Sequence, residues 1–262
     1  MSATDLRTTG PRTGLDAASG VRPVPSDALR LRPAEGRGAA DHGWLRSAYT
    51  FSFAGYHDPA HTGFEALRVI NDDRVAPGGG FPTHPHRDAE IFSYVLDGAL
   101  SHRDTMGTAS TVHAGGVQFM TAGSGVAHSE FNASGTEPVR FLQVWLLPKV
   151  AGASPRYETL DVPADAKSGR LVPIVTEDGG GGGVATHAPA DVYAGTFGPG
   201  QSATFEVREG RRAWVQVARG HLDANGQALA EGDGLAVTQA GLLTLSGGEG
   251  AEVLLFDLQR LG

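Results

Sequence analysis

Two short stretches contain residues that can bind a metal ion, and both use the same spacing. His84 and His86 stand two residues apart, and His128 and Glu130 repeat that spacing further along the chain. In a β-strand, residues two apart project from the same face. Two such strands facing each other would bring three imidazoles and one carboxylate together. This donor set favours one borderline divalent ion: iron, manganese, cobalt, nickel, copper or zinc.

The surroundings of both pairs are typical of strands rather than of helices. A single H-x-H pair is weak evidence in a chain with ten histidines, because surface loops also contain such pairs. Here strand-like runs lie nearby, at Ile91–Leu96 and Val117–Met120, and glycine and proline punctuate both regions. Pro85 holds His84 extended and removes one backbone donor, so its strand is expected at a sheet edge, at a bulge or at its beginning.

Two glutamates compete for the place of the fourth ligand. Glu130 shares strand spacing with His128, whereas Glu90 lies four residues beyond His86 and would also turn inward on an unbroken strand. We favour Glu130, and Glu90 is then either a rival ligand or a partner that orients an imidazole. Two further histidines lie near turns and are expected to have structural roles: His102 and His113.

Composition indicates a folded, turn-rich protein. The 262 residues suffice for one large domain or two smaller ones, and 38 glycines with 15 prolines favour many short strands. The net charge of −8, without a basic run, predicts no direct binding to nucleic acid. The chain has no cysteine, so a metal site must use imidazole and oxygen ligands.

The pattern along the chain predicts an arm and two domains. Residues 1–28 show no strand or helix period and are expected to form a disordered or surface-draped arm. Residues 1–20 lack the apolar core of a signal peptide, and no stretch approaches transmembrane length, so a soluble cytoplasmic protein without membrane contact is expected. Pro148 ends a strong strand, which predicts a metal-binding domain over 29–148 and a second domain over 149–262.

The second half repeats the first without its ligands. Trp214–Leu222 resembles Phe92–Leu100 in pattern, and superposing Gly220 on Gly98 aligns the two halves. Three residues then take the places of His84, His86 and Glu90, namely Glu206, Arg208 and Arg212. The expected fold is therefore all-β, with two jelly-roll β-barrel domains packed together and one of them equipped for metal.

The motifs resemble those of a known superfamily. His84, His86, Glu90 and Gly98 resemble the first cupin motif, and Gly123–Asn132 resembles the second, with glycine where that pattern has proline. More narrowly, the chain from Leu29 onward resembles the pirin family, and within it the short bacterial pirins described as quercetin 2,3-dioxygenase-like. The stretches that carry this likeness are His42–Leu45, Thr83–Glu90, Tyr94–Gly98, His102–Asp104, Met120–Gly123, His128–Glu130 and Glu252–Leu258.

The resemblance implies a bicupin with a mononuclear metal, Fe(II) in the first instance, and a carboxylate ligand at the position of Glu130. It also implies a dioxygenase that opens a flavonol or related enediol with O2, in which Glu130 would act as general base. An alternative implied by the family is a non-enzymatic, metal-dependent regulatory protein that acts through a protein partner. A third hypothesis is a cupin whose metal is structural or supports another reaction.

Overall fold

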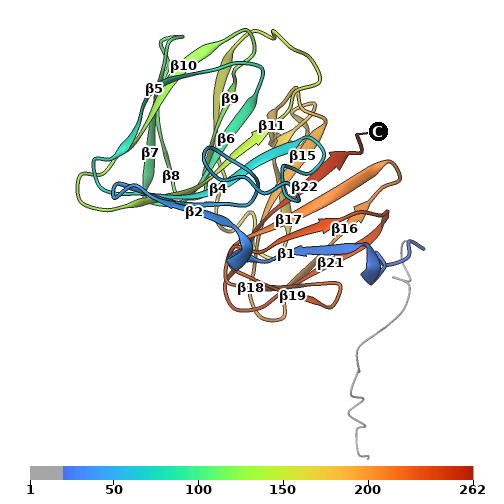
Figure 1. Cartoon of the computed structure of the whole chain (residues 1–262). Coiled ribbons are helices and arrows are strands. Elements are labelled where there is room, and N and C mark those ends of the chain that lie inside the picture. The colour runs from blue at the N-terminus through green and yellow to red at the C-terminus, as the bar shows by residue number, and fades with distance from the viewer. Residues whose placement is uncertain (1–19, 262) are drawn as a thin grey trace, which may run out of the picture.

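The computed structural model describes residues 20–261, and almost all their regular structure is strand (Figure 1). The strands are β1 (Leu29–Arg32), β2 (Gly38–Asp41), β3 (Leu45–Tyr49), β4 (Leu67–Val75), β5 (Gly80–His86), β6 (Glu90–Asp97), β7 (Ala99–Asp104), β8 (Ala109–His113), β9 (Gly116–Thr121), β10 (Val126–Asn132), β11 (Val139–Leu146), β12 (Arg156–Asp161), β13 (Leu171–Thr176), β14 (Val184–Ala185), β15 (Ala190–Phe197), β16 (Ser202–Val207), β17 (Arg211–Arg219), β18 (His221–Ala224), β19 (Gln227–Ala230), β20 (Gly234–Val237), β21 (Gly241–Gly247) and β22 (Ala251–Gln259). Short 3-10 turns occupy Ser26–Ala28, Ala34–Gly36 and Gly180–Gly182. Among the described residues, no helix is long and apolar enough to cross a membrane.

The strands form four sheets, one small and one large in each half of the chain (Figure 1). In the first half the orders are β5-β10-β7-β8 and β12-β9-β6-β11-β4-β3-β2. In the second half they are β16-β21-β18-β19 and β1-β20-β17-β22-β15-β13-β14. This confirms the predicted all-β class with two jelly-roll units, although the sheets of each unit remain separate and do not close into a barrel.

The two large sheets pack against each other and bury their outer faces in one shared core. Successive side chains of strand β11 point to opposite faces of the sheet and so contribute to two different cores. Leu142, Val144 and Leu146 enter the shared core together with residues of the second half such as Phe256. The intervening side chains point the other way, into the first jelly roll, and they are Phe141, Gln143 and Trp145.

Each half of the chain lends a strand to the other. Strand β1 pairs with β20 in the second large sheet, and β12 pairs with β9 in the first. The described part of the predicted arm, residues 20–28, is packed: Val24 and Ala28 are buried in the second core. The rest of that arm, residues 1–19, lies outside the described residues. A strand before residue 148, the predicted division, therefore belongs to the second unit, and a strand after it belongs to the first unit.

The two glycines that aligned the halves occupy equivalent bends. Gly98 joins β6 to β7 and Gly220 joins β17 to β18, with φ values of 73° and 67°. A Cβ atom would lie 2.8 Å from Pro138 O at the first and 2.3 Å from Glu249 O at the second. At both places the chain leaves one sheet for the other, so only glycine fits both the left-handed conformation and the close approach.

The alignment by residue count does not extend to the ligand positions. Glu206, placed by that count on His84, is exposed on β16. The inward side chains of β16 are apolar and pack on the second core, as Phe205 and Val207 do. Strand alternation therefore assigns the inward role to the neighbours of Glu206.

Candidate metal centre

The histidine pairs lie on two adjacent strands of the first small sheet. Strand β5 is the edge strand and pairs antiparallel with β10, so that His84 lies directly opposite His128. The register shifts between His128 and Glu130, which marks a bulge or irregularity at this place. The expectation for Pro85 is confirmed, since its strand is an edge strand with an irregular register.

Three imidazole rings converge inside the first jelly roll. The ring centroids of His84, His86 and His128 are 4.6 to 4.9 Å apart, and their ligand atoms all lie within 4.8 Å of one another. His84 donates its Nδ1 hydrogen to Pro82 O at 2.7 Å, which leaves Nε2 with a lone pair. The Nε2 atoms of His86 and His128 are buried and have no hydrogen-bond partner among the described residues. Such a set of unpaired nitrogens fits a cation, because buried polar atoms otherwise find partners.

Burial keeps the rings of His86 and His128 uncharged. Burial, followed by the nearby His84, lowers the pKa of His86 to about 4 and that of His128 to about 2. Neutral imidazole is the form that binds metal. His86 and His128 therefore present lone pairs rather than protons to the site at neutral pH.

Glu130 stands beside this cluster, deep in the same interior. Its Oε2 lies 4.0 Å from His128 Nε2, but the group whose ligand atoms all lie within 4.8 Å contains only the three imidazoles. Gln143 Nε2 donates to Oε2 at 3.2 Å, and Ser93 Oγ and Gln118 Nε2 donate to Oε1. Burial raises the pKa of the carboxyl to about 7 despite these donors. Glu130 can therefore gain or lose a proton near neutral pH.

Glu90, the rival glutamate, points away from the imidazoles. Its carboxylate accepts hydrogen bonds from Thr121 Oγ1 at 3.1 Å, Thr186 Oγ1 at 3.0 Å and the backbone N–H of His187 at 3.2 Å. The strand does not continue from His86 to Glu90, because the chain turns between β5 and β6. Even-numbered residues of β6 face the shared core, so Glu90 joins the two halves of the molecule.

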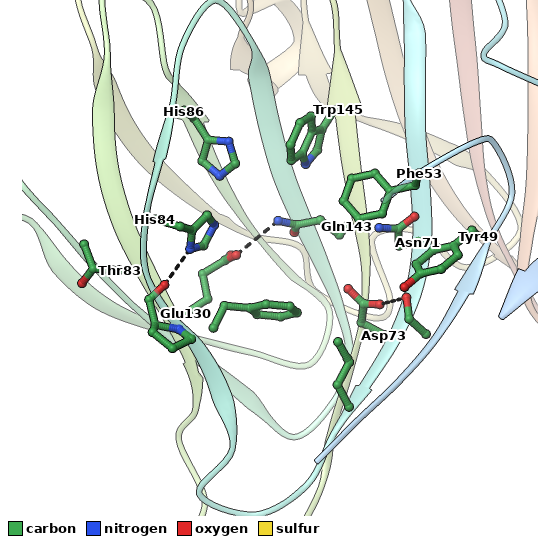
Figure 2. Close-up of a pocket in the computed structure, with 14 residues that line it drawn as sticks. Tyr49, Phe53, Asn71, Asp73, Thr83, His84, His86, Glu130, Gln143 and Trp145 are labelled. Carbon is green, nitrogen blue, oxygen red and sulfur yellow. Dashed lines mark hydrogen bonds between the residues drawn. The ribbon is translucent and has the colours of Figure 1, made fainter. Parts of the chain in front are cut away.

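A cavity of about 460 Å³ opens beside the histidines (Figure 2). Its lining residues are Leu45, Ser47, Tyr49, Phe53, Asn71, Asp73, Phe81, Pro82, Thr83, His84, His86, Glu130, Gln143 and Trp145. Figure 2 shows His84, His86 and Glu130 at one side and Asn71 and Asp73 at the other. The cavity thus joins a candidate metal centre to a polar wall across an aromatic space.

The sequence patterns did not indicate Asn71 and Asp73, which form this polar wall. Asn71 Oδ1 is buried without a hydrogen-bond partner in residues 20–261, and Asp73 accepts a hydrogen bond from Ser47 Oγ. Burial raises the pKa of Asp73 to about 7. The available signal was the run of polar residues closing the strand that begins at Leu67, since strand alternation must bury some of them. Gln143 gave a similar signal as an amide within an apolar strand.

The other sequence candidates divide between the interior and the surface. Tyr49 and Phe53 line the cavity, whereas Phe51, which lies between them in the sequence, belongs to the shared core. His113 is exposed on β8. His102 is buried, and its ring lies 5.2 Å from that of His128. A purely structural role for His102 therefore does not account for its position beside His128.

Two jelly-roll units with one imidazole cluster inside the first define a two-domain cupin. The pirin family model matches residues 30–146, and a model described as the quercetinase C-terminal cupin domain matches residues 173–258. The chain belongs to the pirin family. It is 42% identical over 230 residues to a protein of Escherichia coli K12 named quercetin 2,3-dioxygenase, covering 88% of this chain and 98% of that relative.

Two further relatives extend the comparison. The crystal structure of the bacterial pirin YhhW of E. coli in complex with nickel(II) superposes with a TM-score of 0.84. It is 39% identical and covers 89% of this chain and 100% of its own. A pirin-like protein of Caulobacter vibrioides is 37% identical over 227 residues, covering 86% of this chain and 97% of that relative. The predicted family and fold are thereby confirmed.

Proposed function

We propose that this protein holds one divalent transition-metal ion on His84, His86 and His128, with Glu130 as the fourth ligand. The observation that carries the proposal is the pair of buried, unpartnered Nε2 atoms on His86 and His128. The nickel(II) complex of the E. coli relative supports a divalent ion at such a site. We propose Fe(II) as the native ion because the family resemblance implies it, and metal analysis of the purified protein tests that choice.

We propose that the reaction is the oxidative ring opening of a flavonol or related enediol by O2. The name of the E. coli K12 relative supports this reaction class, and the cavity volume suits a small ligand. Tyr49, Phe53 and Phe81 give the space flat apolar walls against which a planar ring can pack. When bound, the metal would supply Lewis acidity and a template for the substrate oxygen and dioxygen.

Glu130 is the group suited to accept the proton of the substrate hydroxyl. A general base works best with a pKa near the operating pH, and burial raises the pKa of Glu130 to about 7. Gln143, Gln118 and Ser93 fix both carboxylate oxygens, so the base has a defined orientation. The same donors stabilise its ionised form before the proton arrives.

The far wall of the cavity is suited to hydroxyl groups at the other end of the substrate. Asn71 Oδ1 is an unused acceptor, and the Asp73 carboxyl stands on the same strand and face. The lining residues include neither lysine nor arginine. A neutral polyhydroxylated ring would therefore be accepted, whereas a carboxylate placed at this far wall would lose its hydration without gaining a cationic partner.

The experiment is turnover by iron-loaded and nickel-loaded protein under O2, with flavonols and simpler enediols as substrates. Substrate loss and carbon monoxide release are measured together with bound metal per chain. His128→Ala should lose metal and activity, while His113→Ala, which replaces an exposed histidine on β8 of the same sheet, should keep both. Metal-loaded wild type that consumes none of these compounds would refute the dioxygenase and favour the regulatory hypothesis.

A further inference from the structure

A chain of polar groups continues from the candidate metal centre into the small sheet. His128 Nδ1 lies 3.4 Å from His102 Nδ1, and His102 Nε2 lies 3.0 Å from Asp104 Oδ2. The strand register builds this chain, because β10 pairs with β7 so that His128 is opposite Asp104 and Glu130 is opposite His102. All these residues are on alternating positions that face the same interior.

The donors and acceptors in this chain have only one consistent direction for neutral rings. Asp104 Oδ1 accepts the backbone N–H groups of Met106 and Thr108, both at 2.9 Å. Burial would raise the pKa of Asp104, but the bonds from His102 and from Thr108 N–H bring it below its usual value, so the carboxylate is an acceptor only. His102 must then donate through Nε2, and its Nδ1 is left with a lone pair.

The lone pair on His102 Nδ1 determines which ring nitrogen of His128 carries the hydrogen. A hydrogen bond between two Nδ1 atoms needs one donor, and only His128 can supply it. His128 Nδ1 then carries the hydrogen, and its Nε2 carries the lone pair. That Nε2 is the buried atom without a partner in the described chain. His84 achieves the same state by another route, through the carbonyl oxygen of Pro82.

We propose that Asp104 and His102 are positioning residues that fix the tautomer of His128, so that its Nε2 lone pair faces His84 and His86. The consequence for metal affinity rests on the proposed metal binding, whereas the tautomer itself is a property of the metal-free protein. Orienting partners of this kind raise the affinity of a histidine ligand by holding both its ring plane and its basic nitrogen.

An aromatic contact holds the plane of His102. Its ring stacks on Tyr157, with centroids 4.0 Å apart and an angle of 18° between planes. Tyr157 lies on β12, the edge strand that pairs with β9 and completes the first large sheet. Its hydroxyl is 2.5 Å from Ser110 Oγ, so the tyrosine is itself fixed. A variant that keeps an aromatic ring at position 102 can therefore preserve this packing.

The test reads tautomers directly, by NMR of metal-free protein labelled with ¹⁵N on histidine. Ring nitrogens with and without hydrogen differ widely in shift, so His128 should show a protonated Nδ1 and His102 a protonated Nε2. His102→Phe keeps a ring against Tyr157 but offers no acceptor. The Nδ1–H form of His128 should lose its dominance, and the affinity for Ni²⁺ should fall about 10- to 100-fold in a chelator competition.

Two further variants separate the effect of the hydrogen bond to His102 from the effect of ring packing. The side-chain oxygen of His102→Asn can take the place of Nδ1, so this variant should restore the Nδ1–H form and most of the affinity. His113→Phe is the matched control and should change neither. A wild-type His128 with its hydrogen on Nε2, or a His102→Phe variant with unchanged tautomer and affinity, would overturn the proposal. Wild type that binds no metal would instead refute the proposed function, while the tautomers remain measurable.

Discussion

Neighbouring aspartates on β4 should respond to pH in different ways, because alternation sends them to opposite faces of the sheet. Asp73 faces the cavity, where Ser47 Oγ is its hydrogen-bond donor and Glu130 is a nearby acid. Asp72 faces the second half of the chain, and Arg140, on the nearby strand β11, binds both its oxygens at 2.9 and 2.8 Å. Replacing each by asparagine removes one titratable carboxyl with little change of shape.

The sign and size of the Asp73 effect follow from its pKa. Burial raises this pKa from 3.8 to about 7, so the folded protein keeps a proton that the unfolded chain releases. The associated stability is complete below pH 3.8 and is lost as the pH rises through about 7. Between pH 5 and pH 8 the loss amounts to about 3 kcal/mol, at about 1.4 kcal/mol for each pKa unit. Asp73→Asn does not titrate and should escape this loss.

Asp72 provides the control with the opposite sign. Its burial would raise its pKa, but the bonds from Arg140 hold the pKa below its usual value, so its stabilising effect is present above pH 3.8 and is lost only below it. Asp72→Asn removes the carboxylate that binds two nitrogens of Arg140 and leaves Glu231, 2.8 Å away, as the remaining ionic partner of that guanidinium, so it should cost about 1–3 kcal/mol. That cost should be the same at pH 5 and pH 8.

The assay is urea unfolding of chelator-treated wild type and both variants at these two pH values. The free energy of unfolding of Asp73→Asn, relative to wild type, should rise by about 3 kcal/mol from pH 5 to pH 8. The difference for Asp72→Asn should stay negative and constant. A relative stability of Asp73→Asn that does not change with pH would refute the assignment of a protonated, buried carboxyl to the cavity wall.

Three further predictions concern the site and the bends. Glu130→Gln should still bind metal, more weakly, with turnover per bound metal lower by about 10²-fold, measured by activity and metal analysis together; full activity per metal would exclude the base role. Wild type should bind one metal per chain, and chelation should leave the β-sheet circular dichroism intact, because a chain of this length has enough core without a metal. Gly220→Ala should destabilise by about 1–3 kcal/mol more than Gly210→Ala in chemical unfolding. Both glycines have φ near 70–80°, but an added Cβ meets Glu249 O only at Gly220; equal losses would contradict the role given to close approach.

Local patterns in the sequence suffice for the parts of this site that lie on a single strand. Spacing of two residues placed His84 with His86, and His128 with Glu130, on the interior faces of their strands. The proline between the first pair limited its strand to a sheet edge, a bulge or a strand beginning, and the strand is an edge strand. Pairing between distant strands carries no such local signal. The sequence therefore did not reveal that β12 completes the first large sheet and brings Tyr157 against His102.

The two glutamates show where counting residues fails. From His86 to Glu90 the count is even, yet the side chains face different cores, because three residues between β5 and β6 turn the chain from the small sheet to the large one. Asp88 within that turn has φ of 49°, a left-handed value that breaks strand alternation. From His128 to Glu130 no turn intervenes, and the even count holds even across the irregular register. A buried carboxylate can thus be assigned to the imidazoles or to the junction between the two halves only once the turn is known. Glu90 accepts hydrogen bonds from Thr121, on β9 of the same large sheet, and from Thr186, in the second half of the chain. Glu90 therefore belongs to the junction between the two halves.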